Sequence, residues 1–155
     1  MRWAALLTLL TTIYRGGEDS PHAEAGKELK VLARASWQLP VRDATPQQRV
    51  LRSEQELKAA VGNQADALLK ALKVDRIDWK TQMLILVSSG TRRTGGYSVE
   101  ITQLDVRDNA LTVHWKLNAP KPGQPVTQAL THPAQVLLVE RFEGPVRFDP
   151  PAKER

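Results

Sequence analysis

The order of apolar and polar residues predicts a chain built mainly of short β-strands. Residues 83–87 (MLILV) are apolar at every position, which is typical of a strand buried on both faces. Residues 97–106 and 111–117 alternate apolar with polar residues, and the Asp-Asn pair between them is a turn signal, so we expect a hairpin. Residues 136–139 predict a second buried strand, and residues 146–148 predict a final edge strand.

Short strands and two helices are expected elsewhere in the chain. Residues 29–32, 49–52 and 126–130 favour short strands. Ser53 begins a capping box, Ser-Glu-Gln-Glu, in which the Ser53 hydroxyl and the Glu56 carboxylate each accept a backbone N–H, and Gly62 fits the end of that helix. A second helix is expected over residues 64–73, with an apolar face of Ala65, Leu68, Leu69 and Leu72.

This order of elements predicts an α+β fold. We expect a mostly antiparallel β-sheet, arranged as a sandwich or a roll, with two short helices near the N-terminal side. Strands in direct succession argue against a doubly wound parallel sheet. A chain of 155 residues with 41% apolar and 25% charged residues suits one globular domain. We place that domain at residues 26–150, followed by a tail at residues 151–155.

The first 25 residues have the features of a secretory signal. Arg2 gives a basic start, residues 3–13 form an apolar run too short to span a membrane, and residues 23–25 (AEA) match a small-x-small cleavage pattern. The alternative is an N-terminal helix that stays attached. With the signal, the protein is expected to be extracytoplasmic, either periplasmic or secreted, with no integral membrane segment.

Composition disfavours several kinds of chemistry. The chain has no cysteine, which excludes disulfides, thiolate metal sites and cysteine nucleophiles. Its net charge is +5, but the basic residues are dispersed without a basic-aromatic cluster, so we expect a solvated surface and no nucleic-acid partner. His22, His114 and His132 lack metal-ligand spacing, and we expect surface or capping roles for them. We predict no catalytic residue, metal or cofactor; a hydrolase using His114 or His132 is the alternative.

The most unusual segment is residues 88–97 (SSGTRRTGGY), which follow the buried strand. Gly90 and Gly95 have the spacing of a phosphate-binding loop, but Gly-Tyr stands where that loop needs Lys and Ser or Thr, and a strand follows instead of a helix. We therefore expect no nucleotide site. Two interpretations remain open together: a hairpin connection whose glycines take positive φ, and a recognition loop that presents two arginines from a rigid base.

Several segments, in order, resemble the PrcB C-terminal domain family. Residues 90–101 (GTRRTGGYSVEI) resemble its GTRPTGGYSVEI segment, with Arg93 where the family commonly has Pro. Residues 77–79 (IDW), 120–123 (PKPG) and 126–133 (VTQALTHP) resemble further motifs, so the resemblance covers roughly residues 53–139. The family takes its name from a surface lipoprotein that associates with and stabilises a subtilisin-like protease. The lipobox cysteine is absent here, so lipid anchoring is not carried over.

The resemblance implies a non-enzymatic, exported domain that binds a protein partner. A subtilisin-like protease, stabilised or assembled by this domain, is the expected partner. The alternative is a protease inhibitor, because residues 94–97 (TGGY) resemble the TTGY loop of chagasin-type inhibitors, although the companion GxGG and RPW/F loops are not seen. No oligomeric state is predicted. The expected partner-binding residues are Thr91, Arg92, Arg93, Thr94, Gly95, Gly96, Tyr97 and Gln128.

Overall fold

The computed structural model describes residues 27–40 and 45–149. The expected signal at residues 1–25 and the tail at residues 151–155 lie outside the described residues. Within the described part, no helix is long and apolar enough to cross a membrane. The elements in chain order are β1 (Lys27–Glu28), β2 (Val31–Gln38), β3 (Gln47–Leu51), α1 (Glu54–Val61), a 3₁₀ turn (Gly62–Gln64), α2 (Ala65–Leu72), β4 (Gln82–Ser88), β5 (Ser98–Arg107), β6 (Ala110–Asn118), β7 (Pro133–Glu140) and β8 (Val146–Asp149).

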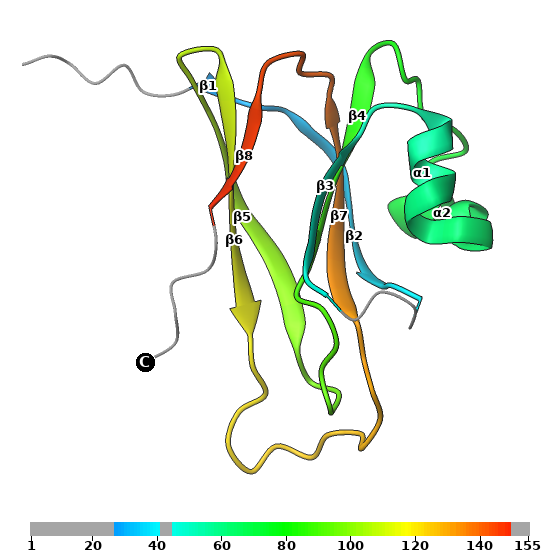
Figure 1. Ribbon diagram of the computed structural model, residues 1–155, viewed down its shortest axis with the longest axis vertical. Helices are drawn as coiled ribbons and strands as arrows, with labels where there is room; N and C mark the ends of the chain where they lie inside the picture. Colours follow the sequence, from blue (N-terminus) through cyan, green and yellow to red (C-terminus); the bar gives the residue numbers. More distant parts are fainter. Residues whose placement is uncertain (1–26, 41–44, 150–155) are drawn as a thin grey trace, which may run out of the picture.

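The strands form two four-stranded sheets that face each other (Figure 1). The first sheet has the order β1-β5-β6-β8, and the second has the order β2-β7-β4-β3. β6 and β8 pair in parallel, and the other strand pairs are antiparallel. α1 and α2 lie on the outer face of the second sheet, so the fold has three layers. The expected α+β sandwich with mostly antiparallel strands is confirmed.

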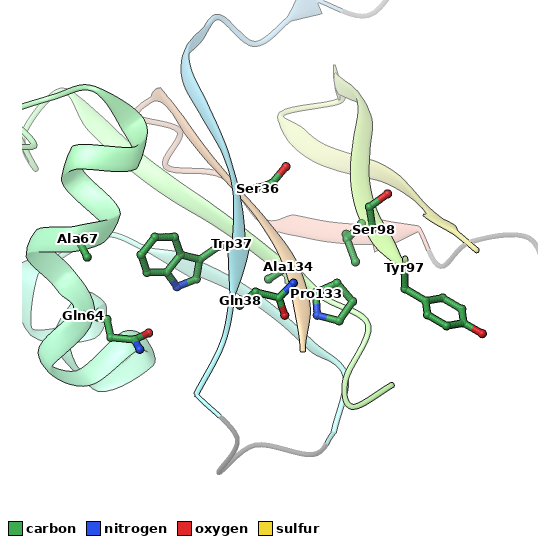
Figure 2. A pocket seen from close by; sticks show the side chains of 10 residues that line it. Ser36, Trp37, Gln38, Gln64, Ala67, Tyr97, Ser98, Pro133 and Ala134 are labelled. Atoms are coloured by element: carbon green, nitrogen blue, oxygen red, sulfur yellow. The ribbon is translucent and has the colours of Figure 1, made fainter. Parts of the chain in front are cut away.

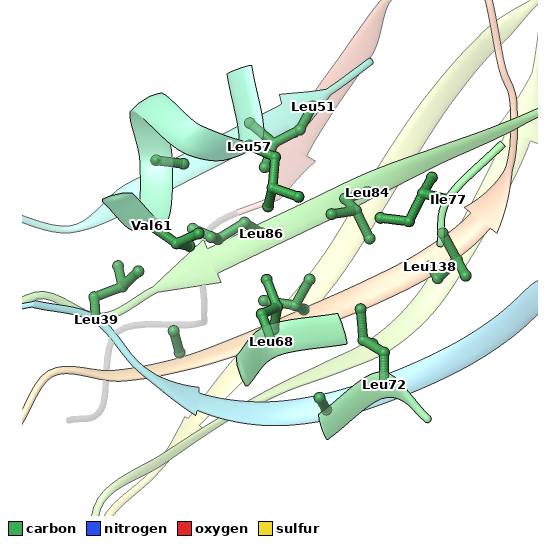
Figure 3. Close-up of a cluster of buried hydrophobic side chains, with 14 residues drawn as sticks. Leu39, Leu51, Leu57, Val61, Leu68, Leu72, Ile77, Leu84, Leu86 and Leu138 are labelled. Atoms are coloured by element: carbon green, nitrogen blue, oxygen red, sulfur yellow. The ribbon is translucent and has the colours of Figure 1, made fainter. Parts of the chain in front are cut away.

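The position of β4 explains its unbroken apolar sequence. Met83, Ile85 and Val87 pack between the two sheets. Leu84 and Leu86 point the opposite way and pack beneath the helices (Figure 3). Because successive side chains of a strand point to opposite faces, a strand between two layers needs apolar residues at every position. Burying each of these side chains contributes about 1.5–3 kcal/mol, which favours the central place of this segment.

The expected helix signals are largely confirmed. Ser53 is the N-cap of α1, and its hydroxyl accepts the backbone N–H of Glu56 at 3.2 Å. The Glu56 carboxylate accepts the backbone N–H of Arg52 instead of that of Ser53, so the reciprocal half of the capping box is displaced by one residue. Gly62 ends the helix with φ of 61°, a conformation that favours glycine.

The second helix is one residue shorter at each end than expected. Residues 62–64 form a 3₁₀ turn, and α2 then begins at Ala65. Leu68 and Leu72 of the expected apolar face are buried against the second sheet, and Ala65 and Leu69 are partly buried beside them. The 3.6-residue period therefore identified the correct face of this helix.

The predicted hairpin is confirmed, and the conformation of its turn explains why Asp and Asn occur there. β5 and β6 pair antiparallel and are joined by Asp108 and Asn109. Both turn residues have positive φ, 49° and 56°, as a two-residue turn that matches the strand twist requires. Asp and Asn tolerate this conformation better than other non-glycine residues.

Three expectations were wrong. The strand expected at residues 29–32 is displaced, because β2 runs over Val31–Gln38 and is longer. Residues 126–130 form no strand, because they are mostly exposed and have no ladder partner after the Pro/Gly run. Residues 89–97 are not a hairpin connection, because β4 and β5 belong to different sheets. This segment crosses from one sheet to the other.

Candidate functional site

Two irregular segments lie together at one end of the sandwich. Residues 89–97 connect β4 to β5, and residues 119–131, followed by His132, connect β6 to β7. In Figure 1 the two segments are seen at the bottom, in green and in yellow to orange. We call these two segments the loop end. It contains every partner-binding residue that the sequence predicted.

Hydrogen bonds fix the two segments of the loop end to each other. Arg92 and Thr131 exchange both backbone bonds, at 2.8 and 3.0 Å. The backbone N–H of Gly95 donates to the carbonyl of Thr127 at 2.9 Å, and the Thr131 hydroxyl donates to the carbonyl of Thr94 at 2.8 Å. Four hydrogen bonds therefore fix the position of the two segments relative to each other.

The two adjacent glycines permit this close approach. Gly96 has φ of 84°, and a Cβ atom there would lie 2.8 Å from both Pro120 Cβ and Val126 Cγ1. A Cβ atom on Gly95 would collide with the Thr127 hydroxyl. The expectation of positive φ is confirmed at Gly96 and also at Gly90, where φ is 76°.

The two arginines of the crossing segment have different roles. The Arg92 guanidinium donates to the hydroxyl and the carbonyl of Ser89 at 3.3 and 3.4 Å. It also lies over the ring of Tyr97, 5.4 Å from the ring centroid, which is a cation–π distance. Arg93 is exposed and makes no hydrogen bond or ion pair with another described residue. Arg92 therefore supports the loop, whereas Arg93 is available to a partner.

His132 lies beneath the loop end, and the expected surface role is wrong for it. Its side chain is 2% exposed, and its Nε2 atom lies 2.5 Å from the Thr91 hydroxyl. Its backbone N–H donates to the Gln38 side chain at 2.9 Å. The following residue begins β7, so this histidine anchors Thr91 to the start of a central strand.

The structure does not bring the two described histidines together. His114 is on β6 in the first sheet, and its Nδ1 atom lies 3.0 Å from Asp149 of β8. His132 belongs to the second sheet and contacts Thr91. No cluster of three or more His, Asp or Glu side chains that could hold a metal ion occurs among residues 27–40 and 45–149.

Leu130 is a contact candidate that sequence reasoning missed. It is 60% exposed, which is high for a leucine, and it lies on the loop end near Gln128, which is also exposed. Residues 126–130 were expected to form a short strand, and under that expectation Leu130 was not considered as a contact residue. The preceding Pro/Gly run was the available signal, because such a run interrupts a strand ladder.

An open cavity of about 500 Å³ lies beside the loop end (Figure 2). Tyr97, the last residue of the crossing segment, belongs to its wall. No carboxylate, histidine or lysine lines it, and its polar lining consists of hydroxyl, amide and indole side chains. The lining residues are Ser36, Trp37 and Gln38 of β2, Gln64 and Ala67 of the helical region, Tyr97, Ser98 and Val99 at the start of β5, and Pro133 and Ala134 of β7.

Comparison with known proteins gives one match. The family model described as PrcB C-terminal matches residues 83–140, from β4 through β7. No curated protein and no solved structure matches the chain. The matched residues include both segments of the loop end. The resemblance seen in the sequence is thus confirmed over residues 83–139, where the chain matches the PrcB C-terminal family, and residues 53–82 lie outside the match.

Proposed function

We propose that this protein is a non-enzymatic binding domain that holds a partner protease at its loop end and stabilises or assembles it. The observation that carries this proposal is the fixed crossing segment, which presents the exposed side chain of Arg93. The family match supports a partner from a protease complex. Export through residues 1–25 and a partner of the subtilisin-like class are parts of the proposal.

The loop end presents a charged and an apolar side chain on segments that hydrogen bonds fix to each other. Arg93 offers a charged, multi-donor group, and Leu130 offers an apolar side chain that water solvates poorly. Arginine is among the residues that most often dominate the binding energy of an interface. Because hydrogen bonds between the two segments already fix the backbone, partner contacts are not offset by the cost of ordering the loops.

Binding to a subtilisin-like protease tests the proposal directly. The affinity of the full chain is measured by biolayer interferometry for wild type, Arg93→Ala, Leu130→Ala and Gln128→Ala. We expect Arg93→Ala to weaken binding by about 10- to 30-fold, which corresponds to about 1.4–2 kcal/mol. Arg49→Ala is the matched control, because Arg49 is an exposed arginine on β3. Equal affinities for wild type and all three loop-end variants would overturn the loop end as the binding surface.

Protease kinetics in the same samples separate stabilisation from inhibition. A stabilising domain lengthens the half-life of the protease on heating and leaves its initial rate on a small chromogenic peptide unchanged. An inhibitor acting through residues 94–97 lowers that initial rate instead. The backbone of Thr94 and Gly95 is already bonded to Thr131 and Thr127, which favours a holding surface over a loop that enters an active site.

A further inference from the structure

β2 is an outer strand of the second sheet, and its register shows which backbone groups face outward. The register against β7 is constant from Ala33 to the end of the strand. The backbone N–H of Leu39 continues it by donating to the carbonyl of His132 at 3.1 Å. Hydrogen-bonded residues alternate along an antiparallel ladder, so the odd-numbered residues of this stretch bond to β7.

The even-numbered residues of β2 therefore point their backbone N–H and C=O groups away from the sheet. These residues are Arg34, Ser36 and Gln38, and all three are exposed. No described strand pairs with this edge. It presents a row of alternating donors and acceptors whose spacing fits one kind of partner, an extended polypeptide backbone.

The edge of β5 on the same side of the sandwich is less open. β1 pairs with Asp105 and Val106 of β5. The backbone N–H of Ile101 is already bonded to the Gln135 side chain at 2.6 Å. On this side of the sandwich, β2 is thus the edge that offers a row of backbone groups without a described strand partner.

Walls on both sides favour a single extended segment as the occupant. The cavity of about 500 Å³ extends from the end of β2 to Gln64 and Ala67 on one side and to Tyr97 and Ser98 of the other sheet on the opposite side (Figure 2). A second copy of the domain would bring its own α2 and its own β5 against the same walls, so edge-to-edge pairing of two copies is disfavoured.

Two buried polar atoms next to the cavity have no hydrogen-bond partner in the described part of the chain. The indole N–H of Trp37 and the side-chain oxygen of Gln64 are buried and have no hydrogen-bond partner among the described residues. Both residues line the cavity. One is a donor and the other an acceptor, and because both atoms are covered from solvent, each reaches an incoming segment only when its side chain turns toward the cavity.

We propose that the outer edge of β2 binds one extended segment of a partner protein as an added β-strand, paired with Arg34, Ser36 and Gln38. This assigns a second surface, next to the loop end through Tyr97. It goes beyond the proposed function, because it does not depend on Arg93 or on the partner being a protease. Main-chain bonds give the affinity, and the walls select the side chains.

A proline substitution at Ser36 tests the edge without breaking the sheet. Ser36→Pro removes an N–H that β7 does not use and places a ring on the open edge, a position where strands tolerate proline. Ser36→Ala is the control, because it keeps the backbone N–H. Far-UV circular dichroism and the melting temperature establish that both variants fold. The probe is a set of octapeptides selected from a random display library on the wild-type full chain.

The selected peptides are expected to bind wild type and Ser36→Ala equally and Ser36→Pro at least about 10-fold more weakly. N-methylation of alternate peptide residues is expected to abolish binding in one set of positions and to spare it in the other. In wild type, bound peptide should slow amide hydrogen exchange at Arg34, Ser36 and Gln38. Arg93→Ala should leave peptide binding unchanged, which separates this site from the proposed function.

Three results would overturn the strand-addition site. The first is a selection that yields no binders. The second is a set of peptides that bind Ser36→Pro as tightly as wild type. The third is self-association of wild type, seen by sedimentation and lost in Ser36→Pro, which would assign the edge to a second copy.

Discussion

The side-chain oxygen of Gln135 accepts the backbone N–H of Ile101 at 2.6 Å, and this bond joins β7 to β5 across the interior. Both residues are buried. The register of β5 against β6 shifts just after Ile101, between that residue and Gln103, so the polar contact lies at an irregular point of the strand. A buried N–H needs a partner, and here the opposite sheet supplies it.

Replacing Gln135 with leucine should destabilise the fold. Gln135→Leu keeps a side chain of similar size but leaves the N–H of Ile101 buried and unpaired, which costs about 1–3 kcal/mol. Urea denaturation measures the free energy of unfolding. The matched control is Gln103→Leu at an exposed position of β5, which should change stability by less than about 0.5 kcal/mol. Equal effects of the two substitutions would show that the bond between the sheets contributes nothing.

Removing the Thr91 hydroxyl should loosen the loop end. Thr91→Val keeps the branched shape but deletes the contact with the buried imidazole of His132, at a cost of about 0.5–1.5 kcal/mol. The amides of Arg92 and Thr131 should then exchange hydrogen faster. The control is Thr112→Val on β6, since the Thr112 hydroxyl bonds to no other described residue. Unchanged exchange at both amides would contradict the anchoring role.

A comparison of Gly96 with Gly123 distinguishes two reasons why a position requires glycine, a positive φ and the close approach of another segment. Both have positive φ, but a Cβ atom on Gly123 meets nothing within 4 Å, whereas one on Gly96 meets Pro120 and Val126. Gly123→Ala should cost about 1–2 kcal/mol through backbone conformation alone. Gly96→Ala should cost more and should also weaken partner binding, because the two segments must separate. Thermal unfolding of the two variants compares them, and equal losses would mean that the close approach is not required.

The turn that contains Asp78, just before β4, should make the stability of the fold depend on pH in the acid range. The Asp78 carboxylate accepts the backbone N–H of Lys80 and then the hydroxyl of Thr81, and these bonds lower the pKa of Asp78. A lowered folded-state pKa gives a contribution that is fully present above the ordinary aspartate pKa and is lost as pH falls through the folded-state pKa. The melting-temperature difference between wild type and Asp78→Asn should therefore shrink from neutral pH to about pH 2.5. A constant difference would show that the charge of Asp78 has no role.

Local sequence signals predicted the elements that depend on interactions between residues close together in the chain. The N-cap at Ser53, the turn at Asp108-Asn109 and the unbroken apolar run of β4 each follow from interactions within a few residues or from burial on both faces. The α+β sandwich followed because these elements occur in direct succession. The binding role expected for the 91–97 loop stays a prediction.

The crossing of residues 89–97 between sheets could not be predicted in the same way. A hairpin and a crossing both join two strands through a short polar segment with glycines, so the local pattern is the same. The difference lies in which strand pairs with β4, and its partners are β3 and β7, far away in the sequence. The burial of His132 depends on the same distant pairing, because the pairing of β4 with β7 brings Thr91 next to His132.

The place of β7 in the second sheet has a consequence for folding kinetics. β7 lies between β2 and β4, although it comes after six other described strands in the chain. Only β5 and β6 are joined by a tight turn, so most pairing requires closure of long stretches of chain, and such topologies fold in milliseconds to seconds. During synthesis, β2 and one edge of β4 have no ladder partner until residues 133–140 have emerged. Unpaired strand edges promote aggregation, so the nascent polypeptide is most prone to aggregate in this interval.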